Sequence, residues 1–141
     1  MLRRDREEWN ALVAALDAQP GGPVHDPESP AWEAKDVYNH FARWIDHSTD
    51  NLEAQLAGRP TTILEGSDNE INARWQAQGA GLRFTQARKH AHAAFERRVA
   101  AIKAVPLDRW DNPLIAIAHA DGYQHYSAHR RYVEAAAETP T

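Results

Sequence analysis

The sequence predicts an all-α protein, a four-helix bundle with one long crossover connection between its second and third long helices. Apolar residues recur at helical spacing in four long segments, and proline and glycine separate these segments. No stretch of convincing length alternates between apolar and polar residues, as a half-buried strand would. Four amphipathic helices of this length are typical of a bundle. A chain of 141 residues suits a single domain spanning residues 1–141.

The first helix is expected from about Arg3 to Ala18, with apolar residues on one face. These residues are Trp9, Leu12, Val13 and Leu16. The segment QPGGPVHDPESP ends this helix because it is rich in proline and glycine.

The second helix is expected to begin with Ser29 as its N-cap and Pro30 in the first helical position. It continues to Gly58, and Pro60 marks its end. Residues 59–82 form the long connection, in which SDNEINARWQAQ predicts a short helix capped by Ser67 or Asp68.

The third long helix is expected from about Phe84 to Ala104, and Pro106 ends it. The fourth begins with Asn112 as its cap and Pro113 in the first position, and it reaches about Glu138.

The stripe of the fourth helix that should face the core carries polar side chains. At roughly 100° per residue, one arc holds Leu114, Ala118, His125, His129, Tyr132 and Ala136, and Asp121 lies beside it. A buried polar group without a partner costs about 1–3 kcal/mol, so these residues need partners. Histidines four apart project side by side and can share one metal ion. The alternative is two core histidines that hydrogen-bond to the backbone or to Asp121, since 8 histidines in the chain can produce this spacing by chance.

The other helices offer further candidates. The predicted buried stripe of the second helix is Val37, Phe41, Trp44, Ser48, Leu52 and Leu56, and His40 and His47 lie on its edge. The third helix buries Phe84, Ala91, Phe95, Val99 and Ile102. Arg88 falls on the same face, so it is expected either to pair with Asp121 or to bind an anionic ligand.

Composition excludes several classes of protein. A net charge of -4 without a block of lysine and arginine argues against nucleic-acid binding. No apolar run approaches the ~18–20 residues of a membrane span, and no signal peptide is evident, so a cytoplasmic location is expected. Because the chain has no cysteine, any metal must be held by nitrogen and oxygen ligands.

Three motifs carry a family likeness. AWEAKDVYNHFARW resembles the second-helix signature of the DinB/YfiT-like metalloprotein superfamily, in which a tryptophan, a polar stretch and a histidine precede another tryptophan. DNEINARW, followed by the helix with Arg88, resembles the middle of these proteins. HADGYQHYSAH resembles their closing His-x-x-x-His and is most similar to the ClbS/DfsB-type branch. The likeness extends from about Arg3 to Val133.

The resemblance implies a metal site with His40, His125 and His129 as ligands and with positions left open for water or substrate. Zn²⁺ or Ni²⁺ is expected, because neutral imidazoles suit both. Relatives include transferases and isomerases that use the thiols mycothiol or bacillithiol, and hydrolases of reactive small molecules. A homodimer is expected from the habit of the family.

Two functions are compatible with this site. A metal-dependent thiol transferase or hydrolase would act on small molecules, because the ion lowers the pKa of a bound water or thiol. Alternatively, a non-catalytic protein would bind or sequester a small molecule or metal. Asp121 could orient an imidazole, complete the coordination, act as the catalytic base, or simply pair with Arg88. The candidate substrate-binding residues are Arg88, Trp44, Trp75 and Asn72, although the tryptophans could be core packing and Asn72 could serve a cap.

Overall fold

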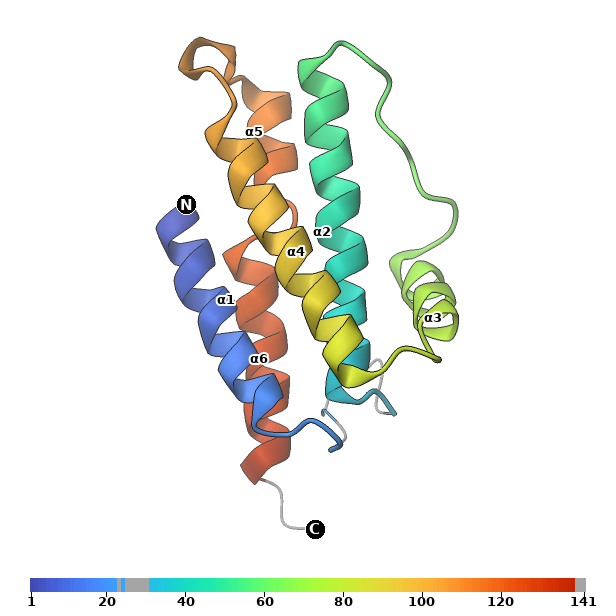
Figure 1. The fold of residues 1–141 in the computed structure, drawn as a ribbon. Coiled ribbons are helices and arrows are strands. Elements are labelled where there is room, and N and C mark those ends of the chain that lie inside the picture. The colour runs from blue at the N-terminus through green and yellow to red at the C-terminus, as the bar shows by residue number, and fades with distance from the viewer. Residues whose placement is uncertain (23, 25–30, 139–141) are drawn as a thin grey trace.

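The computed structural model describes residues 1–22, 24 and 31–138, and this part of the chain is helical with no strand (Figure 1). The helices are α1 (Leu2–Asp17), α2 (Ala34–Leu56), α3 (Asp68–Gln78), α4 (Phe84–Lys103), α5 (Asn112–His119) and α6 (Tyr123–Glu138), with a short 3₁₀ turn at Leu107–Arg109. The all-α prediction is therefore confirmed. None of the helices in these ranges is long and apolar enough to cross a membrane.

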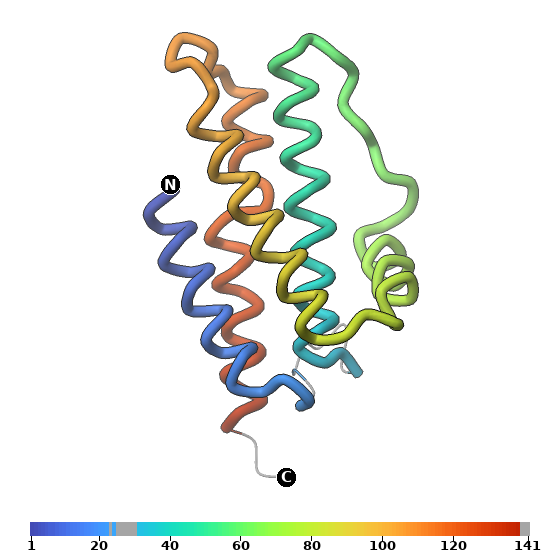
Figure 2. Tube along the Cα trace, viewed as in Figure 1, coloured from blue at the N-terminus to red at the C-terminus, as the bar shows by residue number. Residues whose placement is uncertain are grey.

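The long helices lie alongside one another in two closely packed pairs, α2 with α4 and α1 with α6. Figure 2 shows that the connection after α2, which includes α3, carries the chain back along α2. As a result, α2 and α4 run in the same direction. The segment α5 packs against α2 and continues into α6.

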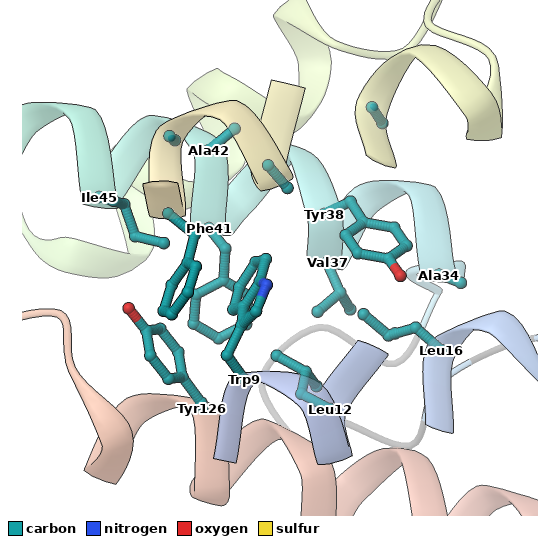
Figure 3. Packing of buried hydrophobic residues seen from close by; sticks show 14 of the residues in the cluster. Trp9, Leu12, Leu16, Ala34, Val37, Tyr38, Phe41, Ala42, Ile45 and Tyr126 are labelled. Atoms are coloured by element: carbon teal, nitrogen blue, oxygen red, sulfur yellow. The ribbon is translucent and has the colours of Figure 1, made fainter. Parts of the chain in front are cut away.

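The core is built around Trp9 of α1 (Figure 3). Its indole stacks on Phe95 of α4 with 4.9 Å between ring centroids, and it meets Phe41 of α2 and Tyr126 of α6 edge to face. Each of the four long helices thus contributes one aromatic ring, which fixes their relative positions. Tyr126 is completely buried between these helices.

The helix ends follow local rules, with two differences from the sequence predictions. The predicted cap Ser29 and first residue Pro30 lie outside the described residues, and α2 begins at Ala34, where Glu33 and Asp36 form a capping box. The cap of α5 is Asp111, not Asn112, because the Asp111 carboxylate accepts the backbone N–H of Leu114 at 3.0 Å. Ser67 caps α3 as predicted.

The predicted fourth helix is broken at residues 120–122, between α5 and α6. Two buried side chains from other helices satisfy the backbone groups that this break exposes. Arg98 donates to the carbonyl of Ala118, and Asp5 accepts the backbone N–H of Tyr123 at 2.8 Å. A Cβ atom at Gly122 would lie 2.9 Å from both Arg98 and Asp5, so any other residue there would have to displace these buried side chains. The prediction of one continuous helix is therefore wrong for a tertiary reason.

Candidate metal centre

Three histidines from two helices converge beside the core. His40 comes from α2, and His125 and His129 come from α6. One ring nitrogen from each lies within 4.8 Å of the others, and Nε2 of His40 is 3.1 Å from Nε2 of His125. The ring of His129 lies 4.8 Å from that of His40 and 5.0 Å from that of His125, measured between centroids. The structure thus brings together the three residues that the sequence predicted as ligands.

Burial keeps the imidazoles of His40 and His129 neutral. His40 and His129 are only 5% and 8% exposed. Burial lowers the pKa of His40 well below its ordinary value, and the neighbouring His129 and His125 lower it further. Burial, together with His125, lowers the pKa of His129 to about 3. Because a histidine must be neutral to bind a metal, His40 and His129 are ready for coordination without losing a proton.

Asp121 fixes the orientation of the third imidazole. Its Oδ1 lies 3.2 Å from Nδ1 of His125, and its Oδ2 accepts a hydrogen bond from the hydroxyl of Ser48. A carboxylate only accepts hydrogen bonds, so Nδ1 of His125 carries the proton and Nε2 presents a lone pair toward His40. A carboxylate behind a histidine is the usual arrangement in metal sites, because it holds the ring and raises its basicity.

The donor set fits a divalent metal ion. Two nitrogens that bind one zinc ion lie roughly 3.3 Å apart when each bond is about 2.1 Å, close to the separation of the two Nε2 atoms. Nδ1 of His40 is buried without a hydrogen-bond partner among the described residues, and an ion on Nε2 would leave it without one. Neutral imidazoles suit Zn²⁺ and Ni²⁺ equally well.

A cavity of about 460 Å³ opens beside the histidines. One wall is α2, with His40, Trp44, His47, Ser48 and Asn51; α3 adds Asp68 and Asn72; and the α5–α6 segment adds Ile117, Ala120, Asp121 and His125. His129 is not part of this lining, so the cavity reaches the centre from the side of His40 and His125. A small molecule could approach two of the three candidate ligands.

Two of the predicted substrate-binding residues lie in this cavity. Trp44 and Asn72 line it, and the indole N–H of Trp44 donates to the Asn72 side-chain oxygen at 2.7 Å. Trp75 packs against Trp44 with 5.0 Å between ring centroids and supports this wall from α3. His47 also lines the cavity, 3.3 Å from the amide nitrogen of Asn51.

Arg88 lies away from the cavity and pairs with Asp17 of α1 at 3.0 Å. The expected ion pair between Arg88 and Asp121 is not formed. The buried arginine of α4 is Arg98, which pairs with Asp5 at 2.8 Å. Sequence reasoning missed it, although its position three residues after Phe95 matches the spacing of the buried face.

Comparisons of the chain with family models, with curated proteins and with solved structures find no match. The likeness to the DinB/YfiT-like superfamily thus remains a prediction from sequence motifs.

Proposed function

We propose that this protein binds one divalent metal ion through His40, His125 and His129 and acts as a metal-dependent enzyme on small reactive molecules. In the same proposal, α1, α2, α4 and the broken α5–α6 segment form a DinB-like four-helix bundle. The observation that carries the proposal is the 3.1 Å distance between Nε2 of His40 and Nε2 of His125, whose ring is oriented by Asp121. Without an ion, this contact requires a proton on Nε2 of His40, because Nε2 of His125 presents a lone pair.

Each residue has a defined task in this proposal. His40 and His129 supply buried neutral donors, and His40 and His125 line the cavity. The ion would supply Lewis acidity, which lowers the pKa of a bound water or thiol. Both oxygens of Asp121 already have hydrogen-bonding partners, so we assign it to orient His125 rather than to act as a general base.

The lining of the cavity favours uncharged or cationic substrates. It contains two carboxylates, Asp68 and Asp121, an indole from Trp44 and the apolar Ile117, and none of the described residues that line it is a lysine or arginine. A polyanionic substrate or thiol would find no cationic partner there apart from the ion. If a thiol is the second substrate, we therefore expect an uncharged one to be used in preference to an acidic one.

Metal content tests the central part of the proposal. Protein purified without a histidine tag should contain about one divalent ion per chain, and His125→Ala should contain much less. His90→Ala is the matched control, because His90 is an exposed histidine on α4 outside the cavity. A wild-type protein without metal, whose melting temperature does not respond to added Zn²⁺ or Ni²⁺, would rule the proposal out.

Turnover separates an enzyme from a binding protein. A panel of model electrophiles is incubated with the protein and with cysteamine, mercaptoethanol or 3-mercaptopropionate, which share the thiol and differ in charge. Consumption that a chelator abolishes and zinc restores supports the enzyme. Consumption of the electrophile should be slowest with 3-mercaptopropionate, the thiol that carries a carboxylate. Metal binding without any turnover across the panel, including hydrolysable esters, supports sequestration instead.

A further inference from the structure

We propose that Ser48 is a positioning residue that sets the protonation pattern of His125 through Asp121. The inference rests on the proposed metal site, because its consequence is a lone pair on Nε2 of His125 directed toward His40. The Ser48 hydroxyl donates to Oδ2 of Asp121, and this bond leaves Oδ1 facing Nδ1 of His125. Ser48 therefore acts on the centre from outside the set of ligands.

The arrangement is rigid because one helix, α2, carries both Ser48 and the candidate ligand His40. His40 and Ser48 are two turns apart on the same helix, and both are buried. Asp121 lies in the non-helical break between α5 and α6, so no helix of its own holds its side chain in place. Within the described ranges, Ser48 and His125 are the hydrogen-bond partners of its carboxylate. Ser48 is thus the contact that ties this carboxylate to the helix bearing His40.

Loss of the Ser48 hydroxyl has a specific consequence. Oδ2 of Asp121 would be a buried acceptor without a donor, and the carboxylate could turn to share either oxygen with His125. The imidazole would then be held by one loosely oriented contact. Its proton could reside on Nε2 part of the time, which removes the lone pair that faces His40. Metal affinity falls with the fraction of the protein that holds both the competent tautomer and the competent ring orientation.

Thr49 provides a matched control. It is the next residue on α2 and is also buried, but its hydroxyl donates to the backbone carbonyl of Ile45 at 2.9 Å. Ser48→Ala and Thr49→Val each remove one buried hydroxyl from the same turn of the same helix. Only the first removes a contact with Asp121, so a purely structural role predicts similar behaviour from both variants.

Two readouts decide the matter. Zinc affinity, measured by competition with a chromophoric chelator, should fall about 10–100-fold in Ser48→Ala and less than about 3-fold in Thr49→Val. In the metal-free proteins, ¹⁵N-edited NMR should find the His125 proton on Nδ1 in wild type and Thr49→Val, and on both nitrogens in Ser48→Ala. If Ser48→Ala does not fold, Ser48→Cys replaces it with the same expectation, because a thiol is a weak donor.

The outcomes separate this inference from the proposed function. Wild-type affinity and an unchanged tautomer in the Ser48 variant would overturn the role of Ser48 and leave the metal site intact. A wild-type protein that binds no zinc would refute the metal site, and the tautomer measurement would still decide whether Ser48 orients His125. Equal losses of zinc affinity in the Ser48 and Thr49 variants would show that Ser48 contributes only to packing and does not position His125.

Discussion

The ion pair between Arg98 and Asp5 predicts a large effect of a single substitution. The side chains are 3% and 0% exposed, and the pair lies 2.8 Å apart between α4 and α1. Each partner also satisfies one backbone group at the break before α6, the carbonyl of Ala118 or the N–H of Tyr123. Arg98→Met keeps most of the volume but leaves the Asp5 carboxylate buried without its counter-charge. Removing one partner of a buried pair costs about 3–5 kcal/mol, a large part of the ~5–15 kcal/mol that stabilises a typical domain.

The assay is urea unfolding of the metal-free protein at pH 7, followed by far-UV circular dichroism and extrapolated linearly to water. Asp5→Asn keeps an acceptor for the Tyr123 N–H, so the double variant with Arg98→Met should lose much less than the sum of the two single variants. Arg88→Met is the control, because the Arg88–Asp17 pair is part-exposed and should contribute no more than about 1 kcal/mol. If Arg98→Met costs less than about 1 kcal/mol, the reasoning about the break is refuted.

Two other predictions concern buried groups. The pKa of His129 is about 3 in the folded protein and ~6.5 in the unfolded chain. Between these two values only the unfolded chain binds the proton, so the folded state loses stability as the pH falls. His40 acts in the same direction, because its pKa is also lowered. Metal-free protein should keep the full contribution of these two histidines to its unfolding free energy above pH ~6.5. Below that pH, the unfolding free energy should fall by up to about 1.4 kcal/mol per pH unit for each of the two histidines. In the same assay, the unfolding free energy of a His40→Gln/His129→Gln double variant should depend less on pH. Equal slopes of unfolding free energy against pH in the wild type and the double variant would contradict the lowered pKa values of His40 and His129. Tyr126→Phe removes a buried hydroxyl that has no hydrogen-bond partner in the described part of the chain, so unfolding free energy should stay level or rise by up to about 1 kcal/mol, and a loss of more than 1 kcal/mol would reveal a missing partner.

Local patterns in the sequence predicted most of the helices and two of the three clustered histidines. Apolar spacing located α1, α3 and α4 to within about one residue at each end, because these helices end at local signals such as Ser67 and Pro106. The His-x-x-x-His spacing and its phase indicated two ligands. His40 was distinguished from His47 by the family likeness, and the structure places His40 in the cluster.

What the sequence could not predict depends on contacts between distant helices. The break at residues 120–122 requires Asp5 and Arg98, and neither is a local signal for residues near 121. Since the inward stripe was calculated for one continuous helix, it left out Tyr126 and Val133, both of which are buried in α6. The hydrogen bond from Ser48 to Asp121 joins residues 73 positions apart, so the spacing of residues in the sequence does not predict it.

Anomalous diffraction at the zinc edge, from crystals grown with Zn²⁺, tests the central claim most directly. The account predicts one strong peak about 2.1 Å from Nε2 of His40, from Nε2 of His125 and from one ring nitrogen of His129. The same peak should disappear in crystals of His40→Gln. A well-ordered triad without a peak, or a fully occupied peak elsewhere on the protein, would contradict the account.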